Sequence, residues 1–181
     1  VVFTSLYDDN VGNPMDTNGD GNGTTPSSGD WRRIEFDETS DDGYCDIHYA
    51  DIQYSGYSNY GVLRTINASP DVTNTLIDQG SGFGIRCDGN SAPVFNTVDI
   101  QNCTSDPIAM SITSNPTFTN ITFTANYSNG IFILEGTLST SDTLIKRNVA
   151  GFTNIPYIID ALNITAGTEL TLEEGIIIKF R

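Results

Sequence analysis

The chain has 181 residues, 38% of them hydrophobic, and a formal net charge of −15 at pH 7. This length suits one domain with its own core. The negative charge argues against nucleic acid and anionic membranes as partners, and favours cations or neutral glycans. The sequence contains no apolar run long enough to span a bilayer and no signal peptide. We therefore expect a mature or excised segment of an exported protein, with no membrane insertion.

The first expected element is a strand over residues 1–6. From residue 7 to residue 30 the apolar pattern disappears, and Asp, Asn, Gly and Pro dominate. A loop of this length in a compact domain is usually functional, or is ordered by something other than a core. We predict a loop insertion over residues 7–30, within a single domain that covers residues 1–181.

This loop contains a candidate calcium site. Its sequence Asp16-Thr17-Asn18-Gly19-Asp20-Gly21-Asn22 places oxygen ligands at alternate positions, with a glycine that permits a sharp turn, as in the first half of an EF-hand loop. The final bidentate Glu and the flanking helices are missing, so further carboxylates from Asp8, Asp9 or Asp30 would have to complete the shell. The expected ligands of Ca²⁺ are Asp9, Asp16, Asn18, Asp20, Asn22 and Asp30. The alternative is a solvated acidic loop without metal.

Residues 44–60 hold five of the eight tyrosines, with acids and amides among them. Aromatic faces beside polar groups are typical of sugar-binding surfaces. The candidate glycan contacts are Tyr49, Tyr54 and Tyr57. The alternative is that these tyrosines pack at turns and shield a sheet edge. We interpret His48, the sole histidine, as a surface strand residue and not as a general base.

A fixed repeat begins near residue 61. Pro70, Pro93 and Pro116 are spaced by 23 residues, and a second series runs in constant phase with them. This second series consists of Val62, Ile85, Ile108 and Ile131. A period of this length is typical of a solenoid, in which each unit buries its apolar face against its neighbours. Alternating short apolar segments separated by Gly, Pro and Asn predict strands and turns, and no window predicts a helix.

The fold expected from these features is an all-β parallel β-helix with about 23 residues per coil and seven to eight coils. Residues 85, 108 and 131 should then form an internal ladder. After residue 136 the repeat loosens, although strands are still expected over 143–146, 154–160, 162–164 and 176–180. We interpret Lys146-Arg147 as a solvated turn.

Both ends of the chain also resemble a known class of domain. The strand Val1-Val2-Phe3-Thr4-Ser5-Leu6, the Asp-rich loop, the segment Gly29-Asp30-Trp31-Arg32-Arg33-Ile34 and the rung over 166–180 are similar to right-handed parallel β-helix domains of the pectate-lyase-like superfamily. Such domains occur in large secreted and cell-surface proteins of bacteria and archaea. The resemblance implies an extracellular or cell-surface location.

The first and last strands have no evident cap. Because unpaired strand edges invite pairing, we expect head-to-tail stacking with another copy, or tandem modules of a longer chain. The alternative is that the ends are artificial.

An enzymatic role is less consistent with the sequence. Many proteins with this fold cleave acidic polysaccharides with clustered carboxylates. Here Asp78 aligns with Gln101 in the repeat, and Asp99 aligns with Leu76 and Thr122, so the acids form no row and we assign no catalytic residue. The expected function is an extracellular structural or adhesive module, stabilised by calcium. The alternative is a carbohydrate-binding or polysaccharide-cleaving domain.

Two residue types bear on the compartment. Cys45, Cys87 and Cys103 are interpreted as small buried hydrophobes, with a bridge between Cys87 and Cys103 as the alternative in a secreted protein. Asn-x-Ser/Thr sequons would permit glycosylation. These sequons lie at Asn22, Asn67, Asn102, Asn120, Asn126 and Asn163.

Overall fold

A computed structural model describes residues 1–181, with the exception of the side chain of Asn59. The described chain consists of short strands and one turn of 3₁₀ helix, η1 (Tyr57–Asn59). None of the helical structure in this description is long and apolar enough to cross a membrane. The expected all-β class is therefore confirmed.

Two parallel sheets form the walls of the fold. The first sheet contains β1 (Val2–Phe3), β3 (Asp46–His48), β4 (Asp51–Gln53), β6 (Asp71–Asp78), β8 (Val94–Gln101) and β10 (Thr117–Thr124). The second sheet contains β2 (Ile34–Phe36), β5 (Leu63–Ile66), β7 (Ile85–Asp88), β9 (Ile108–Met110), β11 (Ile131–Ile133), β14 (Tyr157–Ile159) and β17 (Ile178–Phe180). Every pairing within these sheets is parallel.

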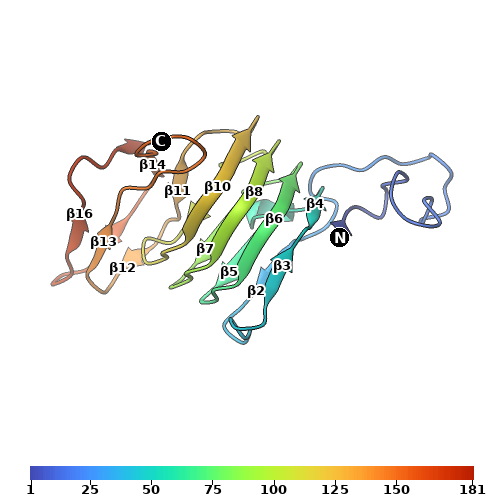
Figure 1. Ribbon diagram of the computed structural model, residues 1–181. Helices are drawn as coiled ribbons and strands as arrows, with labels where there is room; N and C mark the ends of the chain where they lie inside the picture. The colour runs from blue at the N-terminus through green and yellow to red at the C-terminus, as the bar shows by residue number, and fades with distance from the viewer.

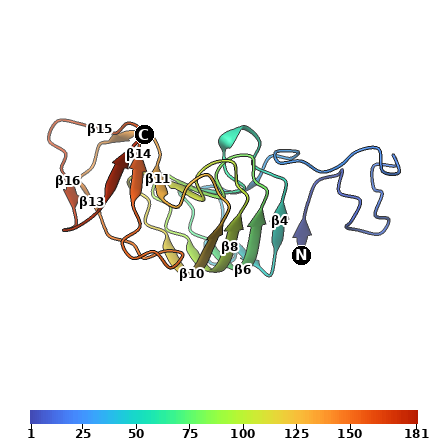
Figure 2. The same cartoon turned by 90° about the horizontal axis from the view of Figure 1, so that it is seen from above.

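As far as β11 the chain alternates between the two sheets, so that each of these coils contributes to both. Figure 1 shows the strands of the first sheet side by side, and Figure 2 shows the two walls enclosing a narrow interior. The second sheet has seven strands, one per coil, which span about six turns from the first to the last. The structure is a parallel β-solenoid, as the repeat predicts.

The register confirms the repeat in the middle of the chain and corrects it on both sides. Val94 pairs with Asp71 and with Thr117, and Ile108 pairs with Ile85 and with Ile131. On the amino-terminal side, Leu63 and not Val62 pairs with Ile85, because that coil is one residue shorter. On the carboxyl side, Ile131 pairs with Tyr157, three residues later than the repeat predicts.

Stacked apolar columns fill the interior. Ile85, Ile108 and Ile131 are fully buried and form the expected ladder. On the opposite wall, the rings of Phe95 and Phe118 stack with centroids 5.6 Å apart. Each side chain therefore packs against its equivalents in the adjacent coils, which is the packing that a solenoid requires.

The three cysteines are free. Cys87 and Cys103 are buried, and burial raises the pKa of each thiol to about 12. The interpretation as buried hydrophobes is therefore correct for these two, and no bridge joins them. Cys45 is half-buried.

The carboxyl-terminal coils widen into additional small sheets. β12 (Thr137–Leu138) pairs with β15 (Asn163–Ile164), and β13 (Asp142–Leu144) pairs with β16 (Leu170–Leu172). These strands replace the long strand that the first sheet would otherwise have after β10.

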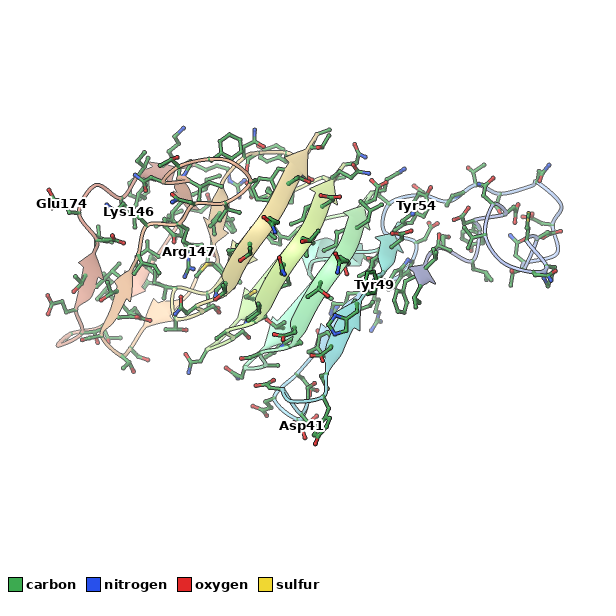
Figure 3. The ribbon with its side chains drawn as sticks, viewed as in Figure 1. Asp41, Tyr49, Tyr54, Lys146, Arg147 and Glu174 are labelled. Atoms are coloured by element: carbon green, nitrogen blue, oxygen red, sulfur yellow. The ribbon has the colours of Figure 1, made fainter. Side chains whose placement is uncertain are left out.

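Arg147 fastens this widened region to the regular coils. Its guanidinium donates to the carbonyl of Pro116 and to the side chain of Asn115, each at 2.7 Å, and to the hydroxyl of Tyr157 at 3.0 Å. The interpretation of Lys146-Arg147 as a solvated turn is therefore wrong for Arg147, which is half-buried (Figure 3). Lys146 is exposed and pairs with Glu173 at 3.6 Å.

The three longest strands share a kink at equivalent positions. Asn74, Thr97 and Asn120 adopt left-handed backbone conformations, with φ of 49°, 59° and 51°. Asparagine tolerates this conformation better than most residues, whereas a β-branched side chain is strained in it. Thr97 is therefore the strained member of the row.

We expect Thr97→Asn to stabilise the protein by about 1 kcal/mol, because it relieves this strain at an exposed position. The reverse change at the equivalent position, Asn74→Thr, should destabilise it by a similar amount. Urea unfolding followed by circular dichroism measures both. Equal midpoints for the two variants would contradict the assignment of strain.

Candidate functional site

The amino-terminal loop projects from the end of the stack beyond β1 (Figure 1). Hydrogen bonds close its base. The carboxylate of Asp30 accepts from the hydroxyl of Ser5 at 2.5 Å and from the amide of Ser27 at 2.9 Å. The indole of Trp31 donates to the carbonyl of Gln53 at 2.8 Å, which ties the returning chain to β4. Asp30 thus acts at the neck of the loop.

Asp16 organises the tip of the loop. Its carboxylate accepts hydrogen bonds from the amides of Gly19 at 2.7 Å, Asp20 at 3.1 Å and Gly21 at 2.9 Å. Gly19 and Gly21 have φ of 77° and 76°, a conformation that favours glycine. The alternating Asp and Gly residues therefore wrap the backbone around one carboxylate.

Asn18 and Asp20 extend this network. The side-chain oxygen of Asn18 accepts from the amide of Asp20 at 3.3 Å, and its NH₂ group donates to the hydroxyl of Thr24 at 2.8 Å. Asp20 accepts from the amide of Gly23 at 3.1 Å and from the hydroxyl of Thr24 at 2.7 Å. The side chain of Asn22 is exposed.

Asp9 is the unsatisfied member of the loop. One of its carboxylate oxygens is buried and has no hydrogen-bond partner among the described residues. Partial burial, together with the negative charges of Asp16, Asp20 and Asp8, raises the pKa of Asp9 above its ordinary value. The structure therefore brings Asp9, Asp16 and Asp20 into electrostatic contact, whereas Asp30 lies at the neck.

The described side chains do not form a complete coordination shell. No group of three or more His, Cys, Asp or Glu side chains among them is arranged to hold a metal ion. The carboxylate of Asp16 accepts from backbone amides instead, and that of Asp20 accepts from one amide and from the hydroxyl of Thr24. A cation at this place would have to replace some of these hydrogen bonds.

The three candidate glycan-contact tyrosines do not gather at one hollow. Tyr49 is 73% exposed at the bend between β3 and β4, and Tyr54 is half-buried at the corner that follows β4 (Figure 3). Tyr57 lies in η1, beside the second sheet, and lines a hollow that includes neither Tyr49 nor Tyr54. Partial burial and the charges of Asp8 and Asp78 raise the pKa of Tyr54.

The acids on the outer face of the first sheet follow the predicted register. Asp78 pairs with Gln101, and Asp99 pairs with Leu76 and with Thr122, so neither acid lies beside another acid in these pairings. One adjacent pair does occur, because Asp46 aligns with Asp71. The repeat did not reveal this pair, since β3 precedes the regular coils.

A cluster of arginines covers part of the second sheet, and sequence reasoning did not identify it. The ring of Tyr60 has three guanidinium carbons near its centroid, at 4.8 Å for Arg33, 5.3 Å for Arg64 and 5.6 Å for Arg86. These distances are within the range of cation–π attraction. The available signal was the spacing of Arg64 and Arg86, which is close to one coil.

Two carboxylates link these arginines. Glu35 accepts from Arg33 at 2.6 Å and from Arg64 at 3.1 Å. Asp88 accepts from Arg64 at 2.7 Å and from Arg86 at 2.8 Å with each carboxylate oxygen. Burial alone would raise the pKa of each acid, but the hydrogen bonds and charges of the arginines hold the pKa of both Glu35 and Asp88 below its ordinary value.

These features define the protein as a parallel β-solenoid with an acidic loop at one end and an arginine cluster on one wall. The sequence profile described as "Right handed beta helix region" matches residues 33–174. The chain therefore belongs to the right-handed β-helix family, which confirms the resemblance at the level of fold. Searches with the whole sequence found no similar curated protein and no similar solved structure.

The ion pairs of Asp88 predict a pH dependence of stability. Because the folded-state pKa of Asp88 is lowered, its contribution is complete above its ordinary value of 3.8 and is lost as the pH falls through the lower folded value. We expect the urea midpoint of the unmodified protein to fall more steeply than that of Asp88→Asn as the pH drops from about 5 to about 2.

At neutral pH, Asp88→Asn should cost about 1–3 kcal/mol, since it leaves two half-buried arginines without their shared carboxylate. Asp71→Asn removes an exposed charge on the other sheet and serves as the control. Parallel pH profiles for Asp88→Asn and the unmodified protein would contradict the prediction.

Proposed function

We propose that this chain is an extracellular structural or adhesive β-helix module whose amino-terminal loop is ordered by Ca²⁺. The observation that carries the proposal is the state of Asp9. A buried carboxylate oxygen without a partner, close to the charges of Asp16 and Asp20, is costly unless a cation neutralises the group.

The chemistry of the loop fits calcium better than it fits other metals. Its side chains offer carboxylate and amide oxygens without nearby thiols or imidazoles, and hard oxygen ligands suit Ca²⁺. Asp9, Asp16 and Asp20 would supply the charge, and Asn18 would supply a neutral oxygen. Asp30 would act at the neck and not as a ligand in the present arrangement.

The expected affinity supports an extracellular role. A surface loop without flanking helices resembles the weaker class of calcium modules, with dissociation constants of about 10⁻⁴–10⁻³ M. Such a site is occupied only where free calcium is in the millimolar range. The loop would therefore be ordered outside the cell.

The solenoid itself supports a mechanical role. Columns of fully buried side chains run through successive coils, and Arg147 joins the regular coils to the widened ones. Order in the loop would remove the longest segment that proteases can enter. The outer face of the first sheet carries exposed polar side chains in regular columns, which suits an adhesive surface.

Calcium should protect the loop against proteolysis. At about ten times its dissociation constant, we expect calcium to slow cleavage between Asp8 and Asp30 about tenfold, and EDTA should reverse this protection. Asp16→Asn should lose the effect of calcium, because Asp16 holds the turn and contributes charge. Limited proteolysis followed by mass spectrometry measures the rate at each bond.

Asp71→Asn, which removes an equal charge from the first sheet, should retain the full response and is the matched control. Cleavage that is unchanged by EDTA in the unmodified protein would contradict the calcium proposal. The same result would leave the mechanical role of the solenoid untouched.

The proposal includes head-to-tail association with a second copy through the last coil. Phe180 continues the inward column that contains Met110, Ile133 and Ile159, yet it is 79% exposed. At the other end, Val2 and Phe3 of β1 are also exposed. A further coil stacked on β17 would cover Phe180 as each inner coil covers its neighbour. The amino-terminal loop projects from the stack at that end (Figure 1), so a head-to-tail contact would have to include it.

Sedimentation velocity and negative-stain microscopy test this association. We expect particle length to grow with protein concentration, with an axial repeat of about 30–35 Å, since coils stack at about 4.8 Å. Phe180→Asp should abolish the growth. Tyr44→Asp, which adds the same charge at a side chain that is 87% exposed, should not affect it. Monomers at every concentration would contradict the association.

A further inference from the structure

The arginine cluster borders an open hollow on the second sheet. The hollow has a volume of about 290 Å³ and is lined by Arg32, Arg33, Tyr57, Ser58 and Tyr60. This volume is just below the usual range for ligand sites, about 300–1,000 Å³, and suits a small group. The hollow lies beside η1, and the carboxylates of the amino-terminal loop do not line it.

The charge at this place is opposite to that of the whole protein. Four of the eight basic residues gather here, in a chain of net charge −15. Arg33, Arg64 and Arg86 surround Tyr60, and Arg32 lines the hollow beside Arg33. The acids paired with them are only two, which are Glu35 and Asp88. A positive surplus therefore remains at the hollow.

A structural role accounts for only part of the cluster. Arg64 and Arg86 are 15% and 19% exposed; both donate hydrogen bonds to Asp88, and Arg64 also donates to Glu35. Arg32, by contrast, is exposed and has no ion pair among the described side chains. Arg32 is thus the unpaired charge at the hollow, whereas Arg33 shares Glu35 with Arg64.

Arg33 still has hydrogen-bond donors to offer. Its Nε donates to Glu35 at 2.6 Å, whereas its two Nη groups have no partner among the described side chains. The paired Nη groups of a guanidinium match the two oxygens of a carboxylate, sulfate or phosphate. The guanidinium carbon of Arg33 lies over the ring of Tyr60, 4.8 Å from its centroid, and this contact restrains the orientation of the two Nη groups.

We propose that this hollow is a binding site for an oxyanion group, held by Arg32 and Arg33. Arg33 donates through its free edge, and Arg32 adds a second guanidinium from the rim. Tyr57, which is 59% exposed, offers an aromatic face to whatever carries the anion. The group is either a free inorganic anion or the acidic substituent of a sugar, and both present the same oxygens to the arginines.

The sole tryptophan provides a direct signal of binding. Trp31 precedes Arg32, and its carbonyl accepts from the amide of Tyr57 at 3.5 Å. Titration of the whole chain with inorganic phosphate, sodium glucuronate or glucose, at constant ionic strength, should change the Trp31 fluorescence in a saturable manner with the two anions and not with glucose. Isothermal calorimetry provides an independent measure.

Arg32→Ala and Arg33→Ala should each weaken anion binding about tenfold, the equivalent of one charge-assisted hydrogen bond. Arg32→Ala breaks none of the described ion pairs, so it tests the site without disturbing the fold. Lys179→Ala removes an exposed positive charge from β17, on the same sheet, and should leave binding unchanged.

Tighter binding of glucuronate than of phosphate would identify an acidic sugar as the source of the group, and the reverse order would identify a free anion. Absence of saturable binding up to about 10 mM, where weak ligands of about 1 mM dissociation constant would saturate, would overturn the proposal. An equal loss of binding in Lys179→Ala and Arg32→Ala would also overturn it, because it would show attraction to net charge alone.

Discussion

The register between successive coils is the constraint on which the remaining structure depends. Parallel pairing aligns Asp71, Val94 and Thr117 in one row, and the same register stacks Ile85, Ile108 and Ile131 inside. A slip of one residue would turn each inward side chain to solvent, because strands alternate their faces. Coil length is therefore fixed by burial, whereas the composition of the outer face is free to vary.

The contrast between a fixed coil length and a variable outer face explains which parts of the structure could be predicted from the sequence. The proline series and the apolar series predicted the fold and the inner columns, because both depend on burial at a fixed period. The loop of residues 7–30 was recognisable by the loss of that period. The exact register failed where coils depart from 23 residues, as at Leu63 and Tyr157.

The electrostatic sites were harder to predict for a physical reason. The contact of Glu35 with Arg64 joins coils of unequal length, and Tyr60 reaches the arginines from a connecting turn. Neither contact follows from periodicity. Likewise, the loop sequence indicated Asp16 and Asp20 as ligands. Only the structure showed that one carboxylate oxygen of Asp9 is buried without a hydrogen-bond partner among the described residues. The role of Arg147 also depended on where the widened coils meet β10.

The equal length of the central coils has a consequence for how such a chain can change in size. Between β6 and β10 on one wall, and between β7 and β11 on the other, successive strands pair with the same offset of 23 residues, so removal or duplication of one whole unit, such as residues 93–115, would leave matching rows in contact. Phe118 would then lie on Val72 as it now lies on Phe95. The domain can therefore lengthen or shorten by entire coils in the middle. The amino-terminal loop and the carboxyl-terminal region held by Arg147 occur once each, so they would have to be kept unchanged.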